Sequence, residues 1–438
     1  MLSSSQASLS PEIWGGIECT INRINDEFRD QLDLSGHYNR PHDLDLFAQL
    51  GITRLRYPIL WERHQADENG NIDWSWATKQ LEQLQTLKIE PIAGLLHHGS
   101  GPAFTSLEDP DFPGHLAAYA GKVARQFPWI NYYTPVNEPL TTARFSGLYG
   151  HWFPHRNNEA SFLRMLINQV KGIVLSMAEI RKVNPFAQLV QTEDLTKTHS
   201  SRSLRYQADF ENKRRWLSLD LLCGKVGPTH FFWPNLLKLG VKKEDLQFLL
   251  ENPCPPDIMG FNYYVTSERY LDRRLYRYPP HLRGGNKWHK YVDTEAVRTS
   301  QWMGAKKLLA EAWKRYEIPM AITECHINCS CDEQLRWFHE TFEQCRELNE
   351  KTKKVVAVTA WALLGSFDWN SLLTKKHNHY EAGVFNLEND RPQWTDLAEM
   401  IRCISLTSGF YKPLLEEKGW WHNIKRKQSS KSRKTILI

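Results

Sequence analysis

The sequence predicts an α/β fold, a single (β/α)8 TIM barrel over residues 1–410, followed by a disordered basic C-terminal tail over residues 411–438. Short β-rich segments alternate with amphipathic helical segments through almost the whole chain, and eight such strand–helix units run in one direction. The predicted strands are apolar on both faces, as strands of a buried parallel sheet must be. Such alternation favours a parallel sheet, and eight units favour its closure into a barrel.

The first unit joins the β-rich segment EIWGGIE, residues 12–18, to a helical pattern over residues 43–50. The next strands are expected, in chain order, at 52–61, 90–98, 130–139, 187–194, 257–264, 319–326 and 355–364. The helices that follow these strands are expected at 75–87, 114–127, 161–183, 204–222, 295–316, 332–350 and 394–405. No expected strand is followed by G-x-G-x-x-G and no P-loop occurs, so a doubly wound sheet is the weaker alternative.

The composition is that of one large folded body. Apolar residues make up 41% of the chain, which has 17 Trp, 16 Tyr and 19 Phe. The formal charge is +5, but residues 425–438 hold six Lys or Arg and no acid, which leaves 49 basic and 50 acidic residues elsewhere. Nucleic-acid binding therefore gets no support. We expect the tail to be solvated, with weak attachment to an acidic surface as the alternative.

The chain shows no targeting or membrane signal. Residues 1–14 lack a charged segment followed by an apolar one, and no apolar run reaches the roughly 18 residues of a membrane span. We therefore expect a cytoplasmic protein whose eight cysteines are reduced thiols. The segment CHINCSC holds Cys325, His326, Cys329 and Cys331, but its spacing is not a standard zinc pattern, so no metal is expected.

In a barrel of this kind the reacting groups come from the C-terminal ends of the strands. The polar residues expected there are Glu18 or Asn22, Arg56, His97, His98, Asn137, Glu138, Glu193, Asp194, Asn262, Tyr264, Glu324, Trp361, Asp368 and Trp369. Two isolated carboxylates stand out, Glu138 on the fourth strand and Glu324 on the seventh. Cleavage of an acetal needs a proton donor on the leaving oxygen and a carboxylate against the oxocarbenium-like carbon. The pair therefore predicts glycoside chemistry.

These motifs resemble glycoside hydrolase family 1, the β-glucosidase family. TPVNEP is similar to the family's T-F-N-E-P acid/base motif, and ITECH to its I-T-E-N-G nucleophile motif. The resemblance, which spans residues 12 to about 405, implies that Glu138 is the acid/base and Glu324 the nucleophile. It also implies that Arg56 and Tyr264 support the nucleophile. The substrate-binding positions that it implies are Asn22, His97, His98, Asn137, Asn262, Trp361, Asp368 and Trp369.

The match is closest to a divergent branch, whose domain is often fused to a dTDP-4-dehydrorhamnose reductase domain. LLHHGSGP, NPCPPDIMG and LLGSFDWNSLL carry this likeness, but no dinucleotide fingerprint follows them, so the reductase is at most a partner. Asn22 stands where the family has a glycone-binding Gln, and Asp368 stands where the family has a Glu that binds sugar hydroxyls. Cys325-His326 stands where the family has Asn-Gly after the nucleophile. The catalytic pair is kept while the specificity pocket differs, so glucose is not assumed.

The resemblance implies a retaining β-glycosidase that hydrolyses a small β-glycoside through a covalent intermediate, without cofactor or metal. Glu324 is expected to be ionised beside Arg56 and Tyr264, and Glu138 to be held neutral by that negative neighbour. The alternative is a non-hydrolytic sugar-binding or scaffolding barrel in a nucleotide-sugar or polysaccharide pathway. For Glu193 and Asp194, a sugar contact and a structural ion pair both stay open. One of His97 and His98 is expected to be a supporting rather than a ligand-contacting histidine.

Overall fold

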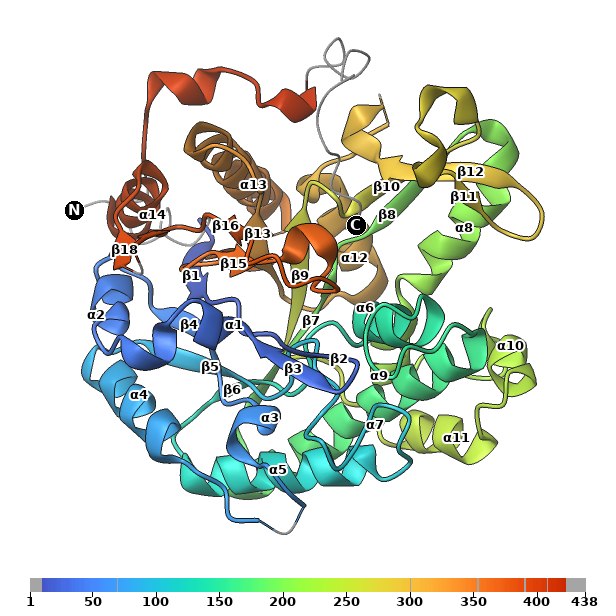
Figure 1. Ribbon diagram of the computed structural model, residues 1–438, viewed down its shortest axis with the longest axis horizontal. Coiled ribbons are helices and arrows are strands. Elements are labelled where there is room, and N and C mark those ends of the chain that lie inside the picture. Colours follow the sequence, from blue (N-terminus) through green and yellow to red (C-terminus); the bar gives the residue numbers. More distant parts are fainter. Residues whose placement is uncertain are drawn as a thin grey trace.

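The computed structural model describes residues 10–422 except 69, 300, 353, 390 and 408. Eight parallel strands close into a barrel in the order β1-β14-β13-β9-β7-β6-β5-β4 (Figure 1). The barrel strands are β1 Glu12–Gly16, β4 Arg54–Pro58, β5 Glu90–Gly94, β6 Tyr132–Thr134, β7 Gln188–Asp194, β9 Ile258–Tyr264, β13 Met320–His326 and β14 Val355–Ala360. The predicted (β/α)8 barrel is confirmed.

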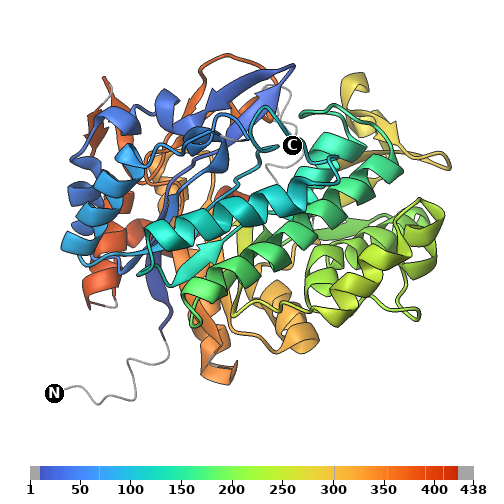
Figure 2. The same cartoon turned by 90° about the horizontal axis from the view of Figure 1, so that it is seen from below.

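Helices surround the barrel on its outside, and α5 and α7 lie side by side there (Figure 2). The main helices are α2 Asp43–Ala48, α4 Ser75–Thr86, α5 Phe112–Gln126, α7 Glu159–Val183, α8 Arg205–Arg214, α9 Leu217–Leu222, α12 Ala305–Tyr316, α13 Cys331–Thr352 and α14 Asp396–Thr407. Shorter helices are α1 Gln31–Leu34, α3 Trp61–His64, α6 Pro139–Ala143, α10 Trp233–Lys238 and α11 Lys243–Glu251. Across the described part of the chain, no helix is long and apolar enough to cross a membrane.

Besides the short strand pairs β15 Ser366–Phe367 with β16 Tyr380–Glu381 and β17 Asn386–Glu388 with β18 Arg391–Gln393, two larger β-rich additions were not predicted. The hairpin β2 Ile21–Ile24 and β3 Glu27–Asp30 follows β1, and a four-stranded sheet has the order β11-β12-β10-β8. This sheet consists of β8 Lys197–Ser200, β10 Glu268–Asp272, β11 Gly284–Gly285 and β12 Lys290–Glu295. The helix expected at 295–316 therefore begins only at Ala305, and the helix expected at 204–222 is split into α8 and α9. Both additions lie in the loops that follow barrel strands, where insertions are tolerated.

A small apolar layer fills the barrel. It consists of Trp14, Ile92, Val190, Ile258, Ala321 and Ala357, which come from six of the eight strands. Such layers make a barrel interior a packed core and confine chemistry to its rim. Gly16, at the end of β1, leaves room for an indole, because a Cβ there would lie 2.6 Å from the ring of Trp361. The small residue thus lets an aromatic side chain close the top of the core.

The start of the expected tail is ordered, so the predicted boundary at residue 410 lies too early. Residues Pro413–Glu416 and Trp420–His422 form short 3-10 helices. Trp421 is 1% exposed, meets the ring of Trp337 of α13 edge-on at 5.1 Å, and donates from Nε1 to Glu340 at 2.8 Å. Apolar contact thus extends the fold beyond α14. The expected disorder of residues 423–438 lies outside the described residues.

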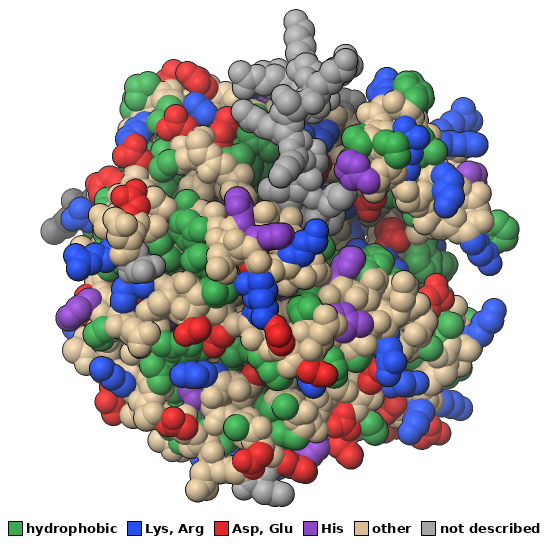
Figure 3. Space-filling view, in the orientation of Figure 1, with side chains coloured by type: hydrophobic (Ala, Val, Ile, Leu, Met, Phe, Trp, Pro, Cys, Tyr) green, Lys and Arg blue, Asp and Glu red, His purple; other side chains and the backbone are tan. Residues whose placement is uncertain are grey.

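Charged side chains of both signs are interspersed over the face of the molecule that Figure 3 shows. Lys and Arg side chains gather more densely on the side of this face that carries α8 and β12. The mixed pattern agrees with the near-balanced charge of residues 1–424.

Candidate active site

Glu138 and Glu324 lie at the C-terminal rim of the barrel and are almost completely buried. Glu138 follows β6 at the start of α6, and Glu324 lies near the end of β13. The register between β13 and β9 shifts next to Glu324, which places it opposite Asn262. A bulge of this kind re-aims a side chain at a barrel rim. The structure therefore brings both predicted carboxyl groups to one rim.

Three residues of this rim adopt the left-handed backbone conformation although they are not glycine. The φ angles are 54° at His98, 45° at Glu138 and 57° at Asp368. Each such residue costs roughly 1–3 kcal/mol unless the surroundings hold it, and such strain clusters at functional sites. Nine other described non-glycine residues also have a positive φ, so this conformation occurs at the rim but is not confined to it.

Arg56 and Tyr264 hold the Glu324 carboxyl group. Arg56 donates from Nη1 to Oε1 at 2.8 Å, and the Tyr264 hydroxyl donates to Oε2. Burial raises the pKa of Glu324, while Arg56, Tyr264 and Asn262 act in the opposite direction. The predicted partners are thus in place. Desolvation raises the pKa of Glu324 more than these partners lower it, so this pKa lies above its ordinary value instead of below it.

The Glu138 carboxyl group has no cation in comparable contact. Asn262 donates from Nδ2 to Oε1 at 2.7 Å, and Nε2 of His98 lies 3.7 Å from Oε2. Burial raises the pKa of Glu138 well above its ordinary value, and the charges of Glu324 and Asp194 raise it further. The two carboxyl groups therefore differ as the resemblance implies, with Glu138 the one held neutral.

Asn137 joins the arginine to the histidine pair. Its Oδ1 accepts from Arg56 and from Thr192, each at 2.8 Å. Its amide nitrogen must therefore donate, and it lies 3.3 Å from Nε2 of His97 and 3.2 Å from Nε2 of His98. Both rings accept at Nε2 and carry their proton on Nδ1. Sequence reasoning missed Thr192, although it is a polar residue directly before Glu193 on β7.

His97 and His98 are neutral in this arrangement. Burial lowers the pKa of His97 well below its ordinary value, and burial and Arg56 lower the pKa of His98 to about 3. Nδ1 of His98 lies 3.0 Å from the Thr142 hydroxyl, which fixes its ring. The ring of His97 stacks on Trp361 at 5.6 Å with an interplanar angle of 8°. Packing on Trp361 holds the ring of His97 in place, and which of the two histidines contacts a ligand stays a prediction.

Two predicted contact residues have buried polar atoms without a partner among the described residues. Asn22, on β2, is 0% exposed, and neither of its side-chain amide atoms has a hydrogen-bond partner. Nε1 of Trp369 is likewise buried and unpaired, and the ring of Trp369 lies 5.5 Å from that of His98. Buried groups left unpaired cost stability, so they are where a polar ligand gains most.

The structure places Asp368 in a structural position, contrary to its predicted role in substrate binding. Arg29 donates to its carboxylate at 2.8 Å, and the backbone N–H groups of residues 377, 378 and 379 donate to the same carboxylate. Asp368 is 0% exposed, so its oxygens are occupied by the protein. Burial opposes the ionised form, but these hydrogen bonds keep the pKa of Asp368 below its ordinary value. The sequence did not indicate a role for Arg29, because this residue lies in the β2–β3 hairpin, far from Asp368 along the chain.

The two acids of β7 serve different parts of the rim. Glu193 accepts from the backbone of Leu140 at 2.9 Å and thereby anchors the start of α6 behind Glu138. Asp194 accepts from the Ser267 hydroxyl, and burial raises its pKa to about 6. Neither forms a close ion pair among the described residues, which removes the salt-bridge alternative. Within the same residues, no group of three or more His, Cys, Asp or Glu side chains could hold a metal ion.

Glycosyl hydrolases that cleave between two acids need two carboxyl groups at one site, and the rim of this (β/α)8 barrel carries such a pair. The model of glycosyl hydrolase family 1 matches residues 19–383. The chain therefore belongs to this family and is a glycosyl hydrolase, which confirms the resemblance of its motifs. The likeness to the reductase-fused branch stays a prediction.

The chain is similar to several characterised proteins. It is 21% identical to a phospho-cellobiase of Klebsiella oxytoca over 364 residues, 74% of this chain and 75% of that one. It is 22% identical to a 6-phospho-β-galactosidase of Streptococcus equi subsp. zooepidemicus over 261 residues, 52% of this chain and 53% of that one. The β-glucosidase of Thermotoga maritima in complex with deoxynojirimycin has the same fold, with a TM-score of 0.74, 14% identity and coverage of 91% and 98% of the two chains.

Proposed function

We propose that this glycosyl hydrolase is a retaining β-glycosidase in which Glu324 is the nucleophile and Glu138 the acid/base. The observation that carries the proposal is the unequal environment of the two carboxyl groups. Glu324 has an arginine and a tyrosine hydroxyl on its two oxygens, whereas Glu138 has only an amide donor. Two titratable groups whose environments push their pKa values apart assign the acid and the base.

In the first step an oxygen of ionised Glu324 attacks the anomeric carbon, and the bond from that carbon to the leaving oxygen breaks. Protonated Glu138 gives its proton to the leaving oxygen, which departs as an alcohol. The sugar is then an ester of Glu324. Arg56 and Tyr264 hold the carboxylate so that one oxygen faces the sugar, which lowers the entropy cost of attack.

In the second step Glu138, now ionised, takes a proton from water while the water oxygen attacks the anomeric carbon. The ester bond breaks, Glu324 regains its charge, and Glu138 regains its proton. Two inversions give a product with the β configuration of the substrate. Charge on Glu324 disappears during the first step, which lowers the pKa of Glu138 and makes it a base when the water must be activated.

The glycone would lie between Asn22, Trp369 and the Asn137 network. Unpaired amide atoms of Asn22 and the unpaired Nε1 of Trp369 supply donors and an acceptor for hydroxyl groups. The Trp361 indole, which packs on His97 and beneath Arg56 at 4.8 Å, closes the base of this site. The expected reductase partner and the cytoplasmic location stay predictions.

Trapping of the intermediate tests the proposal. The protein is incubated with activated 2-deoxy-2-fluoro β-glycosides of several sugars, including 6-phosphorylated ones because one relative is named a 6-phospho-β-galactosidase. Mass spectrometry of the digested protein should find one sugar on Glu324. Glu324→Gln is the matched control and should remain unlabelled. Absence of an adduct with every sugar, in protein that circular dichroism shows to be folded, would favour the non-hydrolytic barrel instead.

A further inference from the structure

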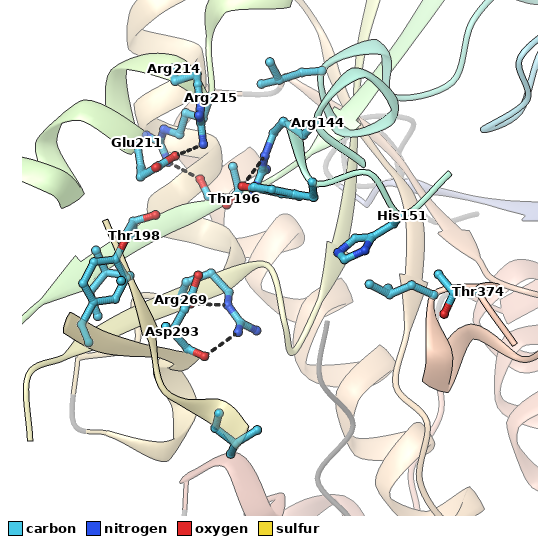
Figure 4. Close-up of a pocket in the computed structure, with 18 of the residues that line it drawn as sticks. Arg144, His151, Thr196, Thr198, Glu211, Arg214, Arg215, Arg269, Asp293 and Thr374 are labelled. Carbon is cyan, nitrogen blue, oxygen red and sulfur yellow. Dashed lines mark hydrogen bonds and ion pairs between the residues drawn. The ribbon is translucent and has the colours of Figure 1, made fainter. Parts of the chain in front are cut away.

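A cavity of about 650 Å³ lies at the C-terminal rim of the barrel, and its lining includes Leu140, two residues after Glu138. It is lined by residues that follow three consecutive barrel strands, and by residues 370–375 next to Trp369 (Figure 4). Leu140 and Arg144 follow β6, Thr196 follows β7, and Arg269 follows β9. The catalytic mechanism proposed above uses none of these side chains.

The cavity lies on the side where a leaving group must depart. Leu140 is two residues beyond Glu138, whose proton goes to the leaving oxygen, and Arg144 comes one helical turn later. The glycone contacts come from β2, from the ends of β5 and β6 and from Trp369, and the cavity begins directly after Trp369 and Glu138 along the chain. Arg144 and Arg269 both interact electrostatically with Asp194, which in turn acts on Glu138. A group bound to the oxygen at Glu138 would therefore extend into this cavity.

The lining carries more positive than negative charge. Its basic side chains are Arg144, Arg214, Arg215, Arg269 and Lys375, and its acidic ones are Glu211 and Asp293. Arg214 pairs with Glu211, and Arg269 with Asp293, where Nε lies 2.8 Å from Oδ1. Arg215 pairs with Glu311 behind the lining. Among the described residues, Arg144 and Lys375 form no ion pair with a carboxylate, although the charges of Glu211 and Asp194 act on Arg144.

Arg144 and Arg269 have the capacity to bind a further group. Among the described residues Arg144 forms no ion pair with a carboxylate, and its Nε and Nη2 share the Tyr149 hydroxyl at 3.3 and 3.1 Å. Nη1 of Arg269 is buried and has no hydrogen-bond partner within the described part of the chain. Figure 4 shows Arg144 above the cavity and Arg269 below it. A buried guanidinium N–H without an acceptor is costly, and an anion supplies that acceptor.

We propose that this cavity is the leaving-group subsite and takes an anionic group, a phosphate or a carboxylate, between Arg144 and Arg269. The inference rests on the proposed function for its position beside the scissile bond, but the anion site itself does not need catalysis. An anionic leaving group would gain charge-assisted hydrogen bonds in a partly enclosed cavity, where they exceed those at an open surface. Substrate choice would then be set by the leaving group as well as by the sugar.

Binding of small anions tests the site without turnover. Phenyl phosphate, benzoate and phenol are titrated onto the full chain, and binding is followed by tryptophan fluorescence or calorimetry. At least one anion should bind, phenol should not, and added salt should weaken binding. Arg144→Gln should weaken binding roughly tenfold, as loss of one charge-assisted contact does. Arg205→Gln, on the exposed face of α8, removes the same charge outside the cavity and is the matched control.

Kinetics test whether the site serves the leaving group. Aryl β-glycosides of the sugar that labels Glu324 are compared, with phenols of equal acidity that bear a phosphate, a carboxylate or no charge. The ratio of kcat/KM for the better anionic substrate to that for the neutral one should be roughly tenfold or more. The ratio should fall in Arg144→Gln and in Arg269→Gln, partly recover in Arg144→Lys, and stay unchanged in Arg205→Gln.

The outcomes separate the inference from the proposed function. Anion binding that depends on Arg144, in a protein that forms no adduct on Glu324, would refute the glycosidase and retain the anion site. Labelling of Glu324 without anion binding, or with equal kcat/KM for charged and neutral leaving groups, would overturn the inference. It would also be overturned if the preference for an anion followed a phosphate on the sugar ring instead of the leaving group.

Discussion

Nδ2 of Asn262 donates to Oε1 of Glu138 at 2.7 Å, and the same side chain also bonds to Glu324. The Thr323 hydroxyl donates to Oδ1 of Asn262 at 2.7 Å and thereby fixes which amide atom faces the acids. One amide thus touches both carboxyl groups of the pair. The charge of Glu324 raises the pKa of Glu138 directly, whereas Asn262 lowers the pKa of both acids.

Replacement of Asn262 should shift the pH dependence of the enzyme. Its hydrogen bonds lower the pKa of Glu324 and of Glu138, so their removal raises both. In the proposed mechanism activity needs ionised Glu324 and protonated Glu138, hence both limbs of the kcat/KM profile should move to higher pH in Asn262→Ala. If the maximum of kcat/KM fell while both limbs stayed at the same pH, Asn262 would have only a packing role.

The Tyr264 hydroxyl should matter for nucleophile strength. Tyr264→Phe removes one hydrogen bond to the Glu324 carboxylate, and kcat/KM should fall roughly 10- to 100-fold, the equivalent of one charge-assisted bond. The acidic limb should move to higher pH, because this bond lowers the pKa of Glu324. Tyr133→Phe is the control, since it deletes a buried hydroxyl that has no partner. Equal losses in the two variants would exclude a specific role for Tyr264.

Azide should distinguish the roles of the two acids. Glu138→Ala should reduce activity roughly 10²- to 10⁴-fold. The loss should be smallest for substrates whose leaving group departs without a proton. Added azide should then release a β-glycosyl azide by attack on the intermediate. In Glu324→Ala, azide should enter from the side of the missing nucleophile and give the α product. The anomeric configuration, read by NMR, would contradict the assignment if the two variants gave the reverse.

Substitutions of Asn22 and of Asp368 should have opposite effects on the free energy of unfolding. Asn22→Leu removes an unpaired buried amide, so the free energy of unfolding should stay equal or rise by about 1 kcal/mol while kcat/KM falls about tenfold. Asp368→Asn leaves Arg29 buried without its anion and should cost about 3–5 kcal/mol of unfolding free energy. Chemical denaturation measures both. Normal stability of Asp368→Asn would contradict the structural role.

A buried carboxyl group outside the carboxyl pair should make stability depend on pH. Burial raises the pKa of Glu62 to about 8, so the folded chain keeps the proton that the unfolded chain loses above about 4.5. Its stabilising contribution is complete below the ordinary pKa and is lost as pH rises towards 8. Glu62→Gln keeps the acceptor for the N–H of Gly101 and carries no charge.

The stability of Glu62→Gln relative to the native chain should therefore increase between about pH 5 and 8, by on the order of 1–4 kcal/mol. Thermal or denaturant unfolding at several pH values gives this difference. Glu82→Gln, at an exposed position of α4, should show no such trend. A constant difference across the pH range for Glu62→Gln would mean that Glu62 titrates alike in both states.

The parts predicted best are those that depend on local pattern. Most of the expected strand–helix units needed only the alternation of apolar runs. The helix expected at 204–222 is interrupted between Arg214 and Leu217, and the helix expected at 295–316 begins only at Ala305. The expected tail failed at its start for a different reason. Trp421 is held by Trp337 and Glu340, which are more than 80 positions away, and no local pattern reports such a contact.

The sequence by itself determined the barrel, the pair Glu138 and Glu324, and the supporting residues Arg56 and Tyr264. Parallel strands of fixed direction bring their C-terminal ends to one rim, so order along the chain already implies proximity there. Only the tertiary structure decided that Asp368 is bound by Arg29, 339 positions away, and that Asn137 fixes both histidines. It also decided which arginines remain unpaired, because charge compensation depends on contacts between loops whose lengths and paths the strand pattern does not specify.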